Sequence, residues 1–191
     1  SNPSLIKSEM SGQFTLSYIN YFSDIKGGFA AYAQNFDKLG TIAATLQFIN
    51  YGDFLETNEL GLELGEFTAA EYALTIGWAK KLSDNWDLGA NIKPIYSVLE
   101  SYTSFGLAAD VASTYKSSDN LFSTSLIVEN IGRQLKTYTS ADPDPLAFDV
   151  KIALSKKFEH APLRFHVLLN NLHTWDVTYG DPDTEQEIDQ F

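Results

Sequence analysis

Nine segments of the chain alternate between apolar and small or polar residues, which is typical of β-strands with one apolar face. Residues 72–78, for example, are Tyr-Ala-Leu-Thr-Ile-Gly-Trp. Because successive side chains of a strand point to opposite faces, this segment has one apolar face and one face of small residues. The same alternation predicts an antiparallel up-and-down β-sheet with strands at roughly 13–22, 27–36, 41–51, 69–81, 86–97, 104–116, 121–130, 146–157 and 162–172.

The lengths of the strands and of their connections favour a membrane barrel. The segments have roughly 10 to 13 residues, whereas five or six are common in soluble sheets and about 9 to 11 cross a bilayer. Every second connection is a short turn, at 37–40, 81–85, 117–120 and 159–161. The others are predicted to be longer, at 52–68, 98–103 and 131–145, with a short exception at 23–26. Short periplasmic turns and long outer loops are typical of outer-membrane barrels.

Aromatic residues lie near both ends of the predicted strands. One group is close to the short turns: Phe36, Trp78, Trp86, Tyr115, Phe122 and Phe158. The other group is close to the opposite ends: Tyr21, Phe22, Tyr51, Phe54, Tyr96 and Tyr102. Two aromatic belts are expected where amphipathic rings lie at the headgroup level of a bilayer. Their placement therefore supports a transmembrane β-barrel.

The direction of the apolar face separates a membrane barrel from a soluble one. The opposite face contains charges of both signs on neighbouring strands: Lys93, Asp110, Glu129, Asp149, Lys151 and Arg164. In a membrane barrel these side chains would form a polar network or line a water-filled lumen. In a soluble barrel they would face solvent and the apolar face would fill the core. Because the apolar side chains are too bulky for a small interior, we predict that they face outward.

Composition narrows the classes of partner. The formal net charge of −12 disfavours nucleic acid, and the absence of cysteine excludes disulfides and thiolate chemistry. No run of about 18 apolar residues predicts a transmembrane helix, and the first residues lack the charged start and apolar core of a signal peptide. We expect residues 1–191 to form a single, partial barrel domain.

Candidate chemistry is sparse. The three histidines lack metal-ligand spacing, and neither a phosphate-binding glycine loop nor a nucleophile elbow is present. We therefore expect no enzyme activity, cofactor or metal. The polar residues of the longer connections are the candidates for binding a partner protein: Glu56, Glu59, Glu63, Tyr138, Asp142 and Asp144. Pro94 lies within a predicted strand and cannot donate to a ladder, so we expect a bulge or kink there.

Several segments resemble a known family. Residues 2–5 (Asn-Pro-Ser-Leu) and 78–91 resemble segments of the FadL-like outer-membrane barrels, with Ser4 where that family has alanine. Residues 18–21, 48–54, 102–110 and 130–136 resemble the PorQ-like members, which are outer-membrane components of the type IX secretion system. The matches extend over most of residues 1–175.

The resemblance implies more than the residues alone predict. It implies a barrel of about fourteen strands, of which this chain would supply nine or ten, without the N-terminal plug and the C-terminal strands. It also implies a bacterial outer-membrane location and a non-enzymatic role as an anchor that holds the cell-surface sortase and attachment complex. The implied partners are outer-membrane lipid and secretion proteins such as PorV, PorU and PorZ.

Two alternatives remain open from the sequence. The first is a FadL-type channel for hydrophobic solutes, with a lateral opening near Pro94. The second is a soluble lipid-binding β-barrel.

Overall fold

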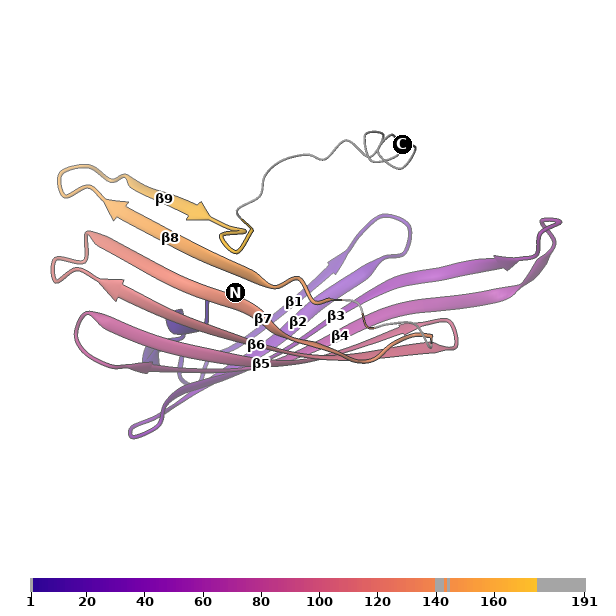
Figure 1. Cartoon of the computed structure of the whole chain (residues 1–191), viewed down its shortest axis with the longest axis horizontal. Helices are drawn as coiled ribbons and strands as arrows, with labels where there is room; N and C mark the ends of the chain where they lie inside the picture. The colour runs from indigo at the N-terminus through magenta and orange to yellow at the C-terminus, as the bar shows by residue number, and fades with distance from the viewer. Residues whose placement is uncertain (1, 140–142, 144, 175–191) are drawn as a thin grey trace, which may run out of the picture.

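The alternating segments form nine strands of one antiparallel sheet, and the strands follow one another in sequence order (Figure 1). The computed structural model describes residues 2–139, 143 and 145–174. The strands are β1 (Phe14–Asn20), β2 (Lys26–Phe36), β3 (Gly40–Thr57), β4 (Glu63–Lys81), β5 (Trp86–Leu99), β6 (Tyr102–Lys116), β7 (Phe122–Lys136), β8 (Asp149–Lys157) and β9 (Arg164–Leu169). The predicted all-β, up-and-down antiparallel topology is confirmed.

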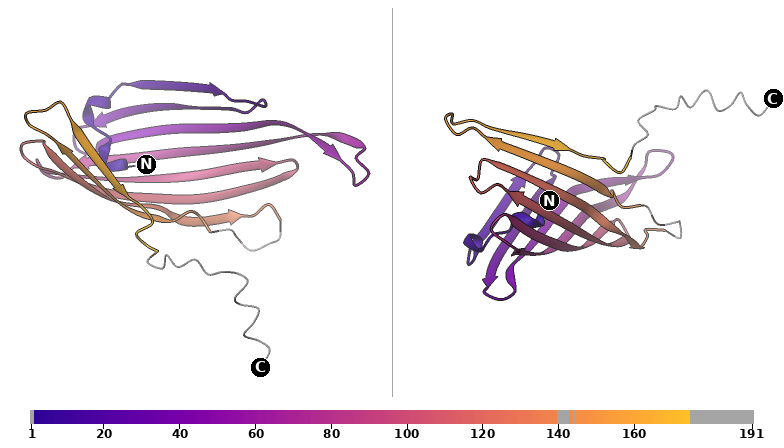
Figure 2. Two further views of the ribbon diagram at one scale, coloured as in Figure 1. Left: turned by 90° about the horizontal axis from the view of Figure 1, so that it is seen from above. Right: turned by 60° about the vertical axis from the view of Figure 1, so that its left-hand side comes forward.

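The sheet is curved and open, and its concave side holds the N-terminal residues (Figure 2). Two short 3₁₀ helices, η1 (Pro3–Leu5) and η2 (Ser8–Met10), precede β1. In the described part of the chain, β1 and β9 are the edge strands and the sheet is not closed. We call the concave side the inner face and the convex side the outer face.

Most of the large apolar side chains of the strands lie on the outer face and are exposed or half-buried. In β4, Leu74 is 38% exposed and Ile76 is 44% exposed, whereas Gly77 between Ile76 and Trp78 is buried. In β6 the exposed Leu107 and Val111 alternate with buried inner-face residues. The alternation of apolar and small residues along each strand therefore gives the sheet an apolar outer face.

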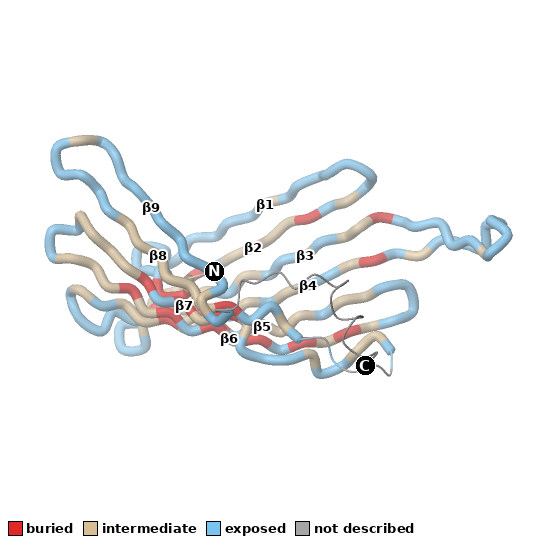
Figure 3. Tube along the Cα trace, turned by 45° about the horizontal axis from the view of Figure 1, so that its top comes forward, coloured by how far each residue is buried: buried red, intermediate tan, exposed pale blue. Residues whose placement is uncertain are grey.

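The buried residues are small or polar. The buried apolar residues of the described chain are mostly alanines: Ala33, Ala69, Ala79, Ala108, Ala112 and Ile127. The buried polar residues include Asp110, Thr114, Ser125 and Glu129. Figure 3 shows that most buried positions lie on the middle strands, β4–β7, whereas the tip of the β3–β4 hairpin is exposed. The fold thus lacks a core of bulky side chains in its described residues.

The connections at one end of the sheet are shorter than predicted. Strands β3 and β4 continue through most of 52–68 and leave a link of only 58–62, and the link between β5 and β6 is only residues 100–101. Strand β7 extends to Lys136, into the predicted loop at 131–145. The prediction of long loops at 52–68 and 98–103 was therefore wrong. Polar residues do not end a strand where both of its faces are exposed, since their side chains remain in water.

The turns at the opposite end are short, as predicted, at 37–39, 82–85, 117–121 and 158–163. The turn after β6 is organised by Asp119, whose carboxylate accepts hydrogen bonds from the Ser117 hydroxyl and the Leu121 N–H. The bond from Ser117, together with that from Leu121, lowers the pKa of Asp119 from its ordinary value. The turn is therefore held by local side-chain contacts.

Pro94 interrupts pairing without shifting the register. The β4–β5 pairs Ala73–Ile95 and Ile76–Ile92 keep one register on either side of it, and only the two pairs between them are missing. The sequence predicted a bulge or a kink at Pro94, and the structure has no bulge there but a local loss of pairing with β4. The missing N–H of proline removes ladder hydrogen bonds, and the neighbouring pairs hold the strand in place.

Candidate functional site

A polar cluster on the inner face surrounds Asp110 of β6. The Asp110 side chain is fully buried, and its carboxylate lies 2.7 Å from the Lys93 ammonium of β5. It also accepts hydrogen bonds from the Asn91 side-chain amide (3.1 Å) and from the backbone N–H of Asn130 (2.9 Å). All three donors point at one buried carboxylate, so its charge is balanced and both of its oxygens accept hydrogen bonds.

The cluster coincides with an irregularity in the β6–β7 ladder. The register shifts between Ala109 and Val111, and Asn130 of β7 has a φ of +58°. Left-handed backbone is tolerated by asparagine better than by most residues. Asp110 accepts the N–H that this irregularity leaves without a ladder partner, which explains why a carboxylate lies in the middle of β6.

A second ion-pair group lies on β7 and β8. Glu129 and Asp149 are directly opposite each other in the ladder. The Lys151 ammonium lies 2.6 Å from the Glu129 carboxylate and 3.4 Å from that of Asp149, so one cation offsets the repulsion between two anions. Asp149 also accepts a hydrogen bond of 2.7 Å from the Asn171 backbone N–H.

Asn130 connects the Asp110 cluster to the segment that precedes β8. Its side-chain oxygen accepts a hydrogen bond of 2.6 Å from Lys93, and its amide nitrogen donates to the Ala147 carbonyl at 2.7 Å. Five of the six residues predicted for an inner polar network thus lie in two ion-paired groups across β5–β8. The sixth, Arg164, is exposed on β9 and donates to the Ser155 hydroxyl at 3.1 Å.

The N-terminal segment is fixed to the same face, which the sequence did not predict. Ser4 is 1% exposed, and its hydroxyl lies 2.6 Å from that of Thr114, which in turn lies 2.6 Å from that of Ser125. The Asn2 carboxamide accepts the Ser4 N–H and caps η1. A Cβ at position 89 would lie 2.4 Å from the Ser4 backbone nitrogen, so Gly89 provides the close approach. A glycine within a predicted strand was the available signal.

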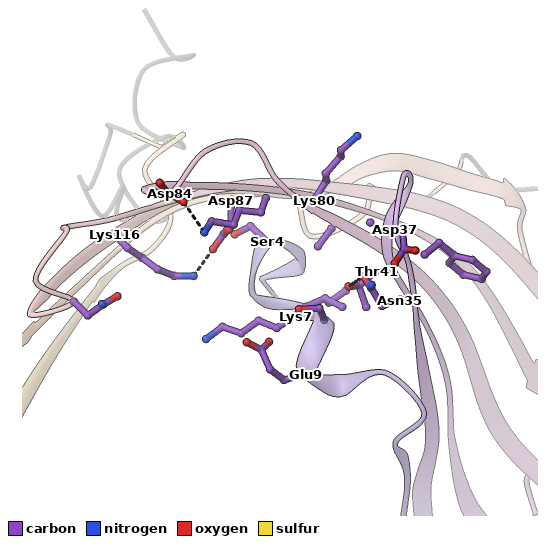
Figure 4. A pocket seen from close by; sticks show the side chains of 17 residues that line it. Ser4, Lys7, Glu9, Asn35, Asp37, Thr41, Lys80, Asp84, Asp87 and Lys116 are labelled. Carbon is purple, nitrogen blue, oxygen red and sulfur yellow. Dashed lines mark hydrogen bonds and ion pairs between the residues drawn. The ribbon is translucent and has the colours of Figure 1, made fainter.

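A polar cavity of about 450 Å³ lies between this segment and the short-turn end of β2–β6 (Figure 4). Its lining carries charges of both signs, with Lys116 paired to Asp87 and Lys81 paired to Asp84. Lys7 and Glu9 face it from the N-terminal segment. Among the described residues that line it there is no histidine or cysteine, and four lysines balance four carboxylates. The cavity suits water and polar groups.

A second hollow, of about 290 Å³, lies against the other half of the sheet, along β1–β5. Its lining is mainly apolar and includes Ile19, Phe29, Ile49 and Ile95. Phe29 and Ile95 are in register with inner-face residues of their neighbours, so the hollow opens on the inner face. It can hold an apolar group.

Four of the six residues predicted to bind a partner protein lie in the described part of the chain, three of them on one hairpin. Glu56, Glu59 and Glu63 lie on the exposed outer part of the β3–β4 hairpin. Tyr138 is half-buried and its hydroxyl donates to the Ser97 hydroxyl of β5. Asp142 and Asp144 lie outside the described residues.

No group of three or more histidine, cysteine, aspartate or glutamate side chains could hold a metal ion within residues 2–139, 143 and 145–174. The helices of the same residues are too short to cross a membrane. Comparison with protein-family models, with curated proteins and with solved structures finds no match for this chain.

Proposed function

We propose that this chain forms part of the wall of an outer-membrane β-barrel that acts, without catalysis, as an anchor in type IX secretion. The proposal of a membrane location rests on the different side chains of the two faces of the sheet. Bulky apolar side chains are exposed on the outer face, and charged side chains are paired and buried on the inner face.

Water is a poor environment for that outer face. Monomeric soluble proteins rarely expose contiguous apolar patches larger than a few hundred Å². Each large apolar side chain left in water instead of an apolar medium costs about 1.5–3 kcal/mol. Exposed apolar residues line every described strand pair from β1 to β9, among them Leu16, Leu46, Leu74, Ile92, Val111, Leu126 and Val167. Hydrocarbon chains would cover all of them at once.

The aromatic residues support the same arrangement. Trp86 and Tyr115 pack at 5.2 Å, and Phe158 and Phe165 pack at 5.6 Å, near the short turns. Tyr21, Phe22 and Tyr102 are exposed near the opposite strand ends. Rings at both ends of an apolar band match the two interfaces of a bilayer.

The anchoring role is supported by the sequence resemblance to PorQ-like proteins and by the lack of candidate catalytic groups on the described inner face. The expected partners are lipid and the secretion proteins PorV, PorU and PorZ. A FadL-type channel for hydrophobic solutes is the second candidate, favoured by the apolar hollow beside Phe29 and Ile95.

Purification tests whether the protein lies in a membrane. We expect the protein to require detergent and to insert into lipid vesicles, whereas a monodisperse monomer in detergent-free buffer would eliminate both membrane functions. Co-purification of tagged protein with PorU, PorV and PorZ then separates the candidates, with an unrelated outer-membrane barrel carrying the same tag as control. Uptake of a fatty acid by vesicles containing the protein alone would favour the channel.

A further inference from the structure

The outer part of the β3–β4 hairpin, residues 51–68, extends beyond the neighbouring strands (Figure 1). We call it the distal hairpin. Strand β2 pairs with β3 only as far as Lys26–Asn50, and β5 pairs with β4 only from Ala69–Leu99. In the described chain, no strand pairs with the outer edges of 53–57 and 63–67. At about 3.3 Å per residue, the ribbon projects about 20 Å past the sheet.

The distal hairpin has a defined conformation. Phe54 and Phe67 stack across it at 5.3 Å. At the tip, the Asn58 side-chain oxygen accepts hydrogen bonds from the backbone N–H groups of Leu60 and Leu62, at 3.0 and 2.9 Å. An isolated two-stranded hairpin is marginally stable in water, so a surface that covers this one would stabilise it.

Its surface combines exposed leucines with negative charge. Leu60 is 85% exposed, and Leu55, Leu62 and Leu64 are also exposed. The carboxylates are Asp53, Glu56, Glu59, Glu63 and Glu66, and the sequence contains no lysine, arginine or histidine from 39 to 79. Natural sheet edges are commonly protected by lysine or proline, and this segment has neither.

We propose that the distal hairpin is a docking arm for a partner protein whose surface is apolar at its centre and basic at its rim. Exposed leucines supply the apolar contact, and the surrounding carboxylates select a basic rim and exclude acidic surfaces. The proposal rests on the proposed function only in placing the hairpin outside the lipid.

Two other occupants fit less well. A second copy of the chain would bring one acidic hairpin against a molecule with a net charge of −12. A lipid surface would have to accept five carboxylates among the leucines, and anionic headgroups would repel them.

Site-specific photo-crosslinking tests the proposal in cells that make the protein. A benzophenone amino acid replaces Leu62 on the distal hairpin or, as the control, Leu39 in an exposed turn at the other end of the sheet. We expect Leu62 alone to crosslink to a protein whose crosslinked peptide, identified by mass spectrometry, contains apolar and basic residues.

The charge requirement has a matched control. The triple variant Glu59→Gln, Glu63→Gln and Glu66→Gln should lower the crosslink yield about tenfold, because three rim contacts are lost together. The variant Asp37→Asn, Asp84→Asn and Glu159→Gln, which removes three charges at the opposite end, should leave the yield unchanged.

Crosslinks from Leu62 to lipid, to a second copy or to nothing would overturn the proposal, as would equal effects of the two triple variants. Failure of the membrane function would be seen separately, as a soluble protein in the purification experiment. A detergent-dependent protein without a crosslink at Leu62 would leave that function standing and remove the docking arm.

Discussion

The wall formed by β5–β8 and the distal hairpin are both antiparallel β-structure, but their polar residues have opposite environments. In the wall, Asp110 and Glu129 are buried and ion-paired on the inner face. In the distal hairpin, Glu59 and Glu63 are exposed in a stretch without basic residues. A charged residue of this sheet therefore contributes to the fold where neighbouring strands bury it, and remains exposed to solvent where they do not.

The substitution with the largest expected effect removes the buried carboxylate of Asp110 from the wall. Asp110→Ala should lower the free energy of unfolding by about 3–5 kcal/mol, because the Lys93 ammonium loses its counter-charge and the Asn130 N–H loses its acceptor. Urea unfolding in lipid vesicles measures this. Adding Lys93→Met should recover part of the loss, since the unpaired charge is then also gone. A loss below 1 kcal/mol for Asp110→Ala would show that the cluster is not needed for the wall.

The second prediction compares the two faces of one strand. Leu74→Arg should cost about 2–4 kcal/mol if residue 74 lies near the bilayer midplane, because the guanidinium then enters hydrocarbon. Thr75→Arg should cost much less, because residue 75 faces inward. The same unfolding measurement applies to both variants. Equal losses would refute the assignment of the faces.

The third prediction concerns the N-terminal segment on the wall. Gly89→Ala should displace η1 and cost about 1–3 kcal/mol, because its Cβ would overlap the backbone of Pro3 and Ser4. Limited proteolysis should then cleave within residues 2–13. Gly106→Ala is the matched control on the same face, since its Cβ would lie 3.9 Å from its nearest neighbours. Equal protease sensitivity of the two variants would mean that the contact at Gly89 does not hold the segment.

The smallest expected effect is on the distal hairpin. Leu60→Ser should change the free energy of unfolding by no more than about 0.5 kcal/mol, because the side chain contacts mainly water. The comparison with Asp110→Ala, measured under the same conditions, would then separate a residue of the fold from a residue of the surface. A loss of several kcal/mol at Leu60 would place it in a packed core.

Much of the fold could be predicted from the sequence, because alternation with period two is a local property. All nine strands follow from it, as do their order and the inward position of residues such as Asp110 and Lys151. The ends of β3 and β4 could not be predicted, since glutamate and leucine in an exposed ribbon resemble a polar loop. The pairing of Asp110 with the Asn130 N–H depends on a register shift between two strands, which no single strand encodes.

The position of the N-terminal segment on the inner face was not predicted, for a similar reason. Gly89 is an ordinary small residue within its strand, and its role appears only when Pro3 and Ser4, far away in sequence, lie against it. The same limit applies to Pro94, where the pairs on either side maintain a register that proline alone would disturb.

The claim that lipid covers the outer face is tested most directly by a spin-label accessibility scan along β4 in lipid vesicles. The chain has no cysteine, so Leu74→Cys, Thr75→Cys and Ile76→Cys each carry one label. We expect oxygen dissolved in the lipid to collide with labels at 74 and 76 far more often than at 75, and we expect a water-soluble nickel complex not to reach 74 or 76. Equal collision rates at the three positions, or access of the nickel complex to 74 and 76, would show that water or protein, and not lipid, covers this face.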